Sequence, residues 1–255
     1  MDYSITKNGK ALVKSKYSID LKNKVFISEE NGLVIDFNGL SSWTFKTKST
    51  CTFNTGGDCT FNTGSTCTFN TNNNCTFITS HSCTFKTGHY GTFKTGDKCN
   101  FDTVSACTFN TGDRCTFNTG HNCTFKTDED CTFRTSYSCT FETDTECTFK
   151  TGDTCTFHTR NACTFKTGYN CTFKTGRYCT FQTGNNCTFD TGDDCTFNTG
   201  NNCTFKTGRD CTFMIWNIST QTFKSGSSGI IFDNMDSKHY LLDEEFIMMR
   251  KVLKG

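Results

Sequence analysis

The chain has 255 residues, and its 26 Lys plus Arg against 25 Asp plus Glu leave almost no net charge. This balance argues against a protein that wraps a polyanion with a basic surface, and equally against a strongly acidic mimic of DNA. No apolar run approaches the ~18 residues of a membrane helix, and the first residues lack the apolar core of a signal peptide, so we expect neither a membrane partner nor Sec export.

The segment 1–42 does not repeat and reads as a β-rich N-terminal cap with a lead-in. Strand-like runs at residues 3–6 and 11–13 flank Asn8-Gly9, a dipeptide typical of tight hairpin turns. Residues 17–21 and 25–28 alternate in polarity, and residues 33–37 lead into the repeats, with residues 35–39 interpreted as a degenerate copy in phase. A cap is expected because the open end of a stacked β array would pair with other chains.

Residues 43–218 are 22 copies of one octapeptide, Cys-Thr-Phe-x-Thr-Gly-x-x. Phe holds the third place in every copy, from Phe45 through Phe125 to Phe213. All 20 cysteines hold the first place, for example Cys51, Cys123 and Cys211. A short fixed period indicates a stack of identical structural units rather than a globular domain.

Strand alternation should send places one, three and five to one face and places two and four to the other. The Cys and Phe columns then form a structural core ladder, while places six to eight form a turn in which Gly would supply positive φ. Two octads would close one coil. The sequence therefore predicts an all-β, single-chain parallel β-solenoid of about 11 two-sided coils, each made of two octads, with β-rich caps at both ends.

The cysteines are expected to be reduced, buried packing residues. Interruptions by Trp43 and Gly91 leave odd runs of cysteines, so pairing neighbours would strand a thiol in each run. Structural zinc sites need close pairs such as Cys-x-x-Cys, whereas these cysteines stand one octad apart. We expect no metal and no cofactor.

Residues 219–255 are predicted to form a C-terminal cap. The apolar residues between 237 and 254 fit either one face of a helix or a hairpin that pairs residues 240–242 with 246–249. The hairpin is favoured.

The octad and its Gly turn resemble the repeats of bacterial ice-nucleation proteins, whose coils are also built from two octads. The motif Cys-Thr-Phe-x-Thr-Gly, together with the lead-in Asn31-Gly32-Leu33-Val34-Ile35-Asp36-Phe37, more closely resembles uncharacterised repeat proteins of bacteriophages and their hosts. The resemblance covers residues 1 to about 213. It implies a β-solenoid fold and a viral setting, in the host cytoplasm during infection or in the virion, but no activity.

Outward charges give the remaining functional signals. With coils of two octads, Arg134, Lys150 and Lys166 fall in one column, which is either a stripe for an anion or partner, or a solvated surface. One corner, the acidic corner, could hold calcium, although Arg160 offers charge balance there. Its acidic residues are Asp128, Glu129, Asp130, Asp144 and Glu146. The outward fourth place is never Thr, which argues against a flat ice-binding face.

No catalytic triad, phosphate-binding glycine loop or paired carboxylate motif can be placed, so the protein is interpreted as non-enzymatic. The leading hypothesis is a monomeric scaffold, a rigid rod that binds an unknown protein partner through its outward places and caps. One alternative is a virion fibre or spike in which three chains intertwine as a homotrimer. A second alternative is a nucleic-acid-binding or DNA-mimicking antagonist of host defence, and ice binding is a minor one.

Overall fold

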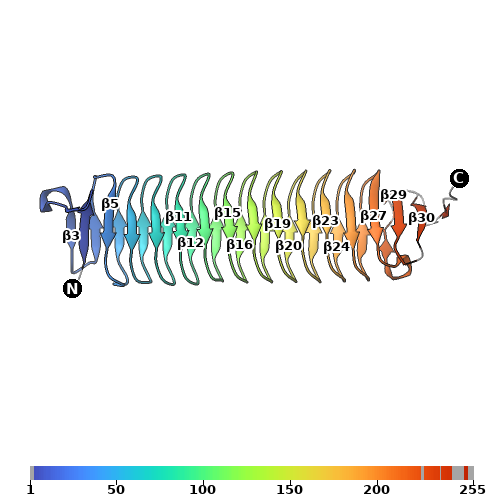
Figure 1. Cartoon of the computed structure of the whole chain (residues 1–255), viewed down its shortest axis with the longest axis horizontal. Helices are drawn as coiled ribbons and strands as arrows, with labels where there is room; N and C mark the ends of the chain where they lie inside the picture. Colours follow the sequence, from blue (N-terminus) through green and yellow to red (C-terminus); the bar gives the residue numbers. More distant parts are fainter. Residues whose placement is uncertain (1–2, 225–226, 236, 243–249, 252–255) are drawn as a thin grey trace. The chain divides into compact units, whose positions relative to one another are not determined.

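A computed structural model describes residues 3–224, 227–235, 237–242 and 250–251. Their regular secondary structure is almost entirely β-strand, and the helical turns among them are the 3-10 segments η1 (Lys14–Lys16) and η2 (Ile218–Thr220). The chain divides into two units, Met1–Asp128 and Glu129–Gly255. In each unit it winds into a parallel β-solenoid in which one coil stacks on the next (Figure 1), and this confirms the predicted fold class.

The first unit contains a short set of irregular strands followed by regular three-residue strands. The irregular ones are β1 (Ser4–Lys7), β2 (Lys10–Ala11), β3 (Ser18–Asp20), β4 (Val25–Ile27) and β5 (Leu33–Asp36). The regular ones are β6 (Thr44–Lys46), β7 (Thr52–Asn54), β8 (Thr60–Asn62), β9 (Thr68–Asn70), β10 (Thr76–Ile78), β11 (Thr84–Lys86), β12 (Thr92–Lys94), β13 (Asn100–Asp102), β14 (Thr108–Asn110), β15 (Thr116–Asn118) and β16 (Thr124–Lys126).

The second unit repeats this pattern and ends in longer strands. Its strands are β17 (Thr132–Arg134), β18 (Thr140–Glu142), β19 (Thr148–Lys150), β20 (Thr156–His158), β21 (Thr164–Lys166), β22 (Thr172–Lys174), β23 (Thr180–Gln182), β24 (Thr188–Asp190), β25 (Thr196–Thr199), β26 (Thr204–Lys206), β27 (Cys211–Ile215), β28 (Thr222–Phe223), β29 (Gly229–Asp233), β30 (Lys238–Leu242) and β31 (Arg250–Lys251).

Successive octads alternate between two parallel sheets, and each octad pairs with the one two copies later. Phe53 in β7 lies opposite Phe69 in β9, while Phe61 in β8 lies opposite Phe77 in β10. The coil of two octads is thereby confirmed. The number of turns is about 13 rather than the predicted 11, because non-repeating strands add coils at both ends. In the first unit β4 and β5 pair in parallel with β6 and β7, and in the second β28 and β29 pair with β26 and β27.

The core is a double ladder of phenylalanine rings, as the strand alternation predicted. Within one sheet the rings stack in parallel, and the centroids of Phe141 and Phe157 lie 4.8 Å apart with the ring planes 2° from parallel, a separation that fits offset stacking. Across the two sheets the rings meet edge to face, and the centroids of Phe149 and Phe157 are 5.2 Å apart at 76°. Both arrangements are favoured by the ring quadrupole, so each ring contributes about 0.5–1.5 kcal/mol per contact beyond its burial.

The cysteines complete this core, and all 20 are buried with free thiols. Each sulfur faces backbone carbonyls at a corner of the coil. The thiol of Cys155, for example, lies 3.5 Å from the carbonyl oxygen of Asp153 and 3.8 Å from that of Ser136 in the preceding coil. A weak donor therefore satisfies carbonyls where the chain changes direction.

The turns differ from the prediction in the place that adopts positive φ. Among the described residues no octad glycine does so; instead the eighth residue is left-handed in every copy from Thr50 to Asp210, with φ between 55° and 62°. Asn and Asp, which tolerate this region best, hold the place in fewer than half of these copies. The backbone ladder continues through the turn, since the amide of Asp58 donates to the carbonyl of Asn73 in the next coil (2.9 Å).

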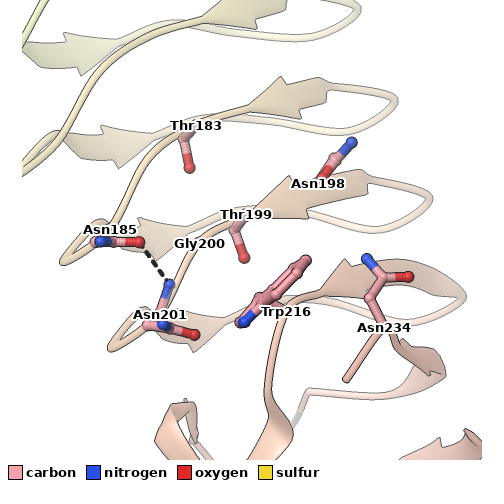
Figure 2. A pocket seen from close by; sticks show the side chains of 8 residues that line it. All are labelled: Thr183, Asn185, Asn198, Thr199, Gly200, Asn201, Trp216 and Asn234. Atoms are coloured by element: carbon pink, nitrogen blue, oxygen red, sulfur yellow. Dashed lines mark hydrogen bonds between the residues drawn. The ribbon is translucent and has the colours of Figure 1, made fainter. Parts of the chain in front are cut away.

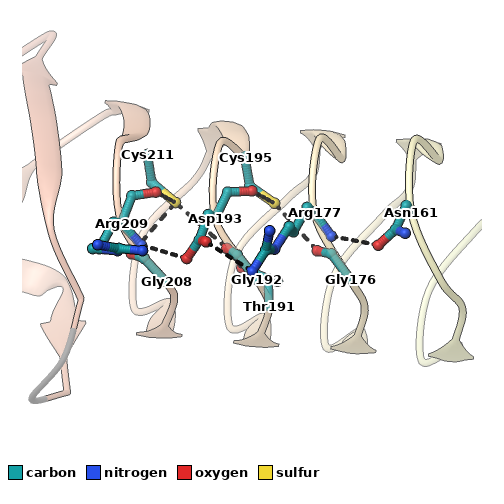
Figure 3. A network of polar contacts seen from close by, with 10 residues as sticks. All are labelled: Asn161, Gly176, Arg177, Thr191, Gly192, Asp193, Cys195, Gly208, Arg209 and Cys211. Carbon is teal, nitrogen blue, oxygen red and sulfur yellow. Dashed lines mark hydrogen bonds and ion pairs between the residues drawn. The ribbon is translucent and has the colours of Figure 1, made fainter.

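The sixth-place glycines have another cause, which is the close approach of the preceding coil. The Oδ1 atom of Asp193 accepts a hydrogen bond from the amide of Arg209 one coil later, at 2.9 Å (Figure 3). The carboxylate then covers Gly208, where an added Cβ would overlap it. The same bond, at 2.9 Å, joins Asn161 to the amide of Arg177 above Gly176. A side-chain acceptor at place seven thus demands Gly at place six of the next coil.

The N-terminal strands form a β-rich cap that differs from the predicted register. Asn8 and Gly9, both at positive φ, join β1 to β2 in an antiparallel hairpin, and β1 also pairs with β5. Ile35 lies opposite Phe53, so residues 35–39 are displaced by two places from the phase of the array, and the in-phase prediction was wrong. The displacement brings Phe37 against Trp43 and Phe45, which closes the end of the core.

At the C-terminal end the chain leaves the repeat and turns back on itself. β29 continues the parallel sheet of β27, and β30 then pairs with β29 in antiparallel orientation. β31 pairs with β30 in antiparallel orientation, with Tyr240 opposite Lys251 and Leu241 opposite Arg250, a register displaced from the predicted pairing of residues 240–242 with 246–249. The predicted partner strand at residues 246–249 lies outside the described residues.

Candidate functional site

The predicted cationic column exists in the second unit. Arg134, Lys150 and Lys166 are the last residues of β17, β19 and β21, and they lie opposite one another in consecutive coils. All three are exposed, because they hold the outward fourth place. The same column continues with Gln182 on β23. We call Arg134, Lys150 and Lys166 the cationic stripe.

The charges of the stripe stand next to one another on the surface. Neighbouring coils lie about 4.8 Å apart, at which two like charges in water repel by roughly 1 kcal/mol, less with salt. Among the ion pairs of the described residues, none involves a member of the stripe. The opposite sheet is different, since Lys206 pairs with Asp190 at 3.3 Å. The cationic stripe therefore presents three adjacent positive groups that an anionic ligand could bridge.

The residues of the predicted core ladder all lie in the interior. Phe45, Phe125 and Phe213 are buried, and so are Cys51, Cys123 and Cys211. The hydrogen bond between the Cys59 and Cys75 thiols lowers the pKa of Cys59 and raises that of Cys75, while burial raises the pKa of both. Burial also keeps substrates and metal ions away from the sulfurs. The ladder is therefore structural.

The acidic corner is balanced internally in the second unit, where Arg160 pairs with Asp144 at 3.5 Å. Another corner pairs Arg177 with Asp193 at 3.4 Å (Figure 3). Within the described ranges, no three His, Cys, Asp or Glu side chains are grouped so as to hold a metal ion. No helix in that part of the chain is long and apolar enough to cross a membrane.

Trp216 is a surface residue for which the repeat pattern predicted no role. It occupies the sixth place, where other copies have Gly or a small or polar residue in all but a few cases. The structure leaves this side chain 59% exposed beside an asparagine-lined groove. A bulky aromatic residue at a turn place was the signal that could have identified it.

Comparison of the chain with protein-family models, with curated proteins and with solved structures finds no match.

Proposed function

We propose that this protein is a non-enzymatic scaffold that binds partners through its outward repeat places and its caps. The observation that carries this proposal is that the places of the octad have separate roles. Places one, three and five face the interior and pack there, and the thiols are buried. The fourth place is outward and variable in sequence from coil to coil. A regular lattice of exposed side chains on a fixed backbone suits recognition better than catalysis, which needs convergent groups in a recess.

The cationic stripe is the proposed contact for an anionic partner. Its three charges repeat at the coil spacing, and a partner with phosphates or carboxylates along an extended chain could neutralise them together. The alternative of a nucleic-acid-binding antagonist of host defence rests on this same surface. A phage origin, in the infected cytoplasm or in the virion, rests on the resemblance of the motif alone.

The stripe is tested with a triple variant, Arg134→Ala, Lys150→Ala and Lys166→Ala. The matched control removes Lys46, Lys86 and Lys94, which also hold exposed fourth places but do not form one column. A fluorescent single-stranded oligonucleotide is titrated between about 50 and 200 mM salt, where three phosphate contacts give a log–log slope of about −2. Loss of binding in the stripe variant alone supports a nucleic-acid partner. Equal binding by the wild type and the stripe variant rejects it.

The scaffold itself is tested by its mass in solution and by its location. Each coil closes with two octads of one chain, and the Phe and Cys columns of that chain fill the space between the sheets. This arrangement supports a monomer, so sedimentation should give a mass near 28.6 kDa. A stable trimer would favour the fibre alternative. Mass spectrometry of purified phage particles would distinguish a virion component from a cytoplasmic protein.

A further inference from the structure

A polar groove lies beside Trp216 near the end of the second unit. Its volume is about 370 Å³, within the ~300–1,000 Å³ of small-molecule sites. It is lined mainly by amide, hydroxyl and indole groups, from Asn185, Asn198, Thr199, Asn201, Trp216 and Asn234. Figure 2 shows the indole ring between Asn201 and Asn234, with Thr199 in the adjoining coil. None of the residues that line the groove carries a charge.

The position of Trp216 is not explained by packing. One coil earlier the same place is Gly200, which must lack a side chain because Asn185 Oδ1 covers it and accepts from the Asn201 amide at 2.8 Å. Asn201 does not repeat this bond, and its Oδ1 instead accepts from the Thr220 hydroxyl at 3.4 Å. The change leaves room for a large residue. The indole that fills it remains 59% exposed, although burial would stabilise it.

The backbone around the indole is held firmly. The carbonyl oxygen of Trp216 accepts from the amide of Met235 at 2.9 Å. The buried carboxylate of Asp233 accepts from the amides of Ile218 and Met235, both at 2.9 Å, and so ties together the segments on either side of the groove. A site whose walls are already ordered loses little conformational entropy when a ligand binds.

The groove offers polar groups to a ligand. The Thr199 side chain is buried, and its hydroxyl makes the contact with the following thiol, Cys203, that Thr175 makes with Cys179 elsewhere in the repeat. This hydroxyl therefore belongs to the core of the repeat, and the groups available to a ligand are amides. The amides of Asn198 and Asn234 are exposed, and each can donate and accept at once.

We propose that this groove binds a neutral oligosaccharide. The apolar face of a pyranose ring can stack on an exposed indole, and adjacent hydroxyls can each exchange hydrogen bonds with an amide side chain, which is both donor and acceptor. The absence of charged lining residues disfavours an anionic sugar or a nucleotide phosphate. This site does not involve the cationic stripe or its partner. Oligosaccharide binding at the groove and anion binding at the stripe are therefore tested independently.

The first unit supplies an internal control. A groove of about 340 Å³ there is also lined by asparagines, including Asn38, Asn54 and Asn70, but it contains Asp36 and no aromatic residue. Its hydroxyls are satisfied, since Thr55 and Thr71 donate to the carbonyls of the residues that follow them. Asparagine-lined corners are thus a feature of the repeat, and the exposed indole distinguishes the groove at Trp216.

Tryptophan fluorescence provides a direct test, because the only other tryptophan, Trp43, is buried at the N-terminal end. The full chain is titrated with cellohexaose, maltohexaose and chitohexaose, and with a thymidine oligonucleotide of similar length. We expect a saturable change in Trp216 emission with at least one hexasaccharide. A Trp43→Phe variant should retain the change, since it removes only the buried signal.

Binding by the variants is measured calorimetrically. Trp216→Ala should weaken binding at least about tenfold, the effect of losing an aromatic contact of ~1.4 kcal/mol, and Trp216→Tyr should restore most of it. Asn234→Ala should weaken binding without touching the indole, whereas Asn54→Ala in the control groove should leave it unchanged. The proposal is overturned if no hexasaccharide binds, if Trp216→Ala and Asn234→Ala both bind like the wild type, or if only the oligonucleotide gives a saturable response.

Discussion

At the scale of single residues, the turns are controlled by pairs of residues one coil apart. Asp153 Oδ1 accepts from the amide of Tyr169 at 2.9 Å and lies over Gly168. Gly96 is not covered by a side chain, and the nearest atoms to an added Cβ are the backbone of Ser80 at 3.3 Å. The two glycines hold the same place in the octad but face different neighbours.

Gly168→Ala should therefore destabilise the protein by about 1–3 kcal/mol, because the new methyl group displaces Asp153 and leaves a backbone amide unpaired. Gly96→Ala should cost under about 1 kcal/mol. Denaturant unfolding measures both. In the double variant Asp153→Ala with Gly168→Ala the cost should be smaller than the sum of the single ones. Additive costs would mean that the carboxylate does not explain the glycine.

The inward and outward places could be read from the sequence, because strand alternation depends only on the parity of each place. The role of Gly could not. Place eight, which adopts positive φ, is held by residues as different as Thr154, Tyr178 and Asn186. The residue type at this place therefore does not indicate its conformation. The contact that requires Gly208 comes from Asp193 in the preceding coil, and it becomes visible only when the coil length is known.

At the scale of the strand ladder, the stacked rings should dominate stability. Phe125 is buried and stacks on Phe109 with centroids 4.8 Å apart. Phe125→Ala should cost about 3–5 kcal/mol, since it removes a ring and leaves a cavity in a regular stack. Asn110→Ala, on an exposed outward place, should cost under about 0.5 kcal/mol. Similar shifts in the denaturation midpoint for the two variants would contradict the inward assignment of Phe.

The thiols of the cysteine column should be unreactive in the folded protein. All 20 cysteines are buried, so a reagent reaches their sulfurs only when the coils open locally. A thiol reagent such as Ellman's should react slowly with the native protein and titrate all 20 groups after unfolding. Rapid reaction of many groups under native conditions would show that the interior is open to solvent.

The N-terminal cap should give stability a pH dependence. Lys7 and Lys16 hold Glu30 at 2.7 and 3.0 Å, and their hydrogen bonds lower the pKa of that carboxyl from its ordinary value of 4.5. The folded state therefore favours the charged form. This contribution is present above pH 4.5 and disappears as the pH falls through the lower folded value. Glu30→Gln should reduce the loss of melting temperature between neutral and acidic pH, and an unchanged loss would exclude a role for this cluster.

At the scale of the whole molecule, the sequence predicted the coil and its two faces because every octad carries the same information. The register of the end strands could not be predicted, because these strands are displaced from the phase of the array. Ile35 pairs with Phe53, and Phe205 pairs with Phe223, so in both cases the offset exceeds one coil by two places. The cationic stripe could be predicted from the sequence, because the coil length alone determines which residues share a column. The groove at Trp216 could not be predicted in this way, since Asn234 lines it from a segment outside the repeat.

If each coil contacts only its neighbours, a whole coil should be removable. Deleting Cys155–Asn170 joins the left-handed Thr154 to Cys171, and the octad phase is kept. The turn rule is kept as well. Asp153 would then lie one coil before Asn185, and the sixth-place residue beneath its carboxylate would be Gly184 in place of Gly168. The shortened protein should fold, with a melting temperature lowered by only a few degrees.

Deleting residues 155–166 instead joins Thr154 to Thr167, so that the next Phe arrives out of phase and the turn Gly168 falls where a strand must begin. The rings on either side of the junction could not stack, and a coil cannot order without that contact, because fixing each backbone residue costs about 1–2 kcal/mol. Circular dichroism melting should show one cooperative transition for the whole-coil deletion and a lost or much broader one for the out-of-phase deletion. Equal stability of the two would mean that the repeat does not fold through contacts between octads two copies apart.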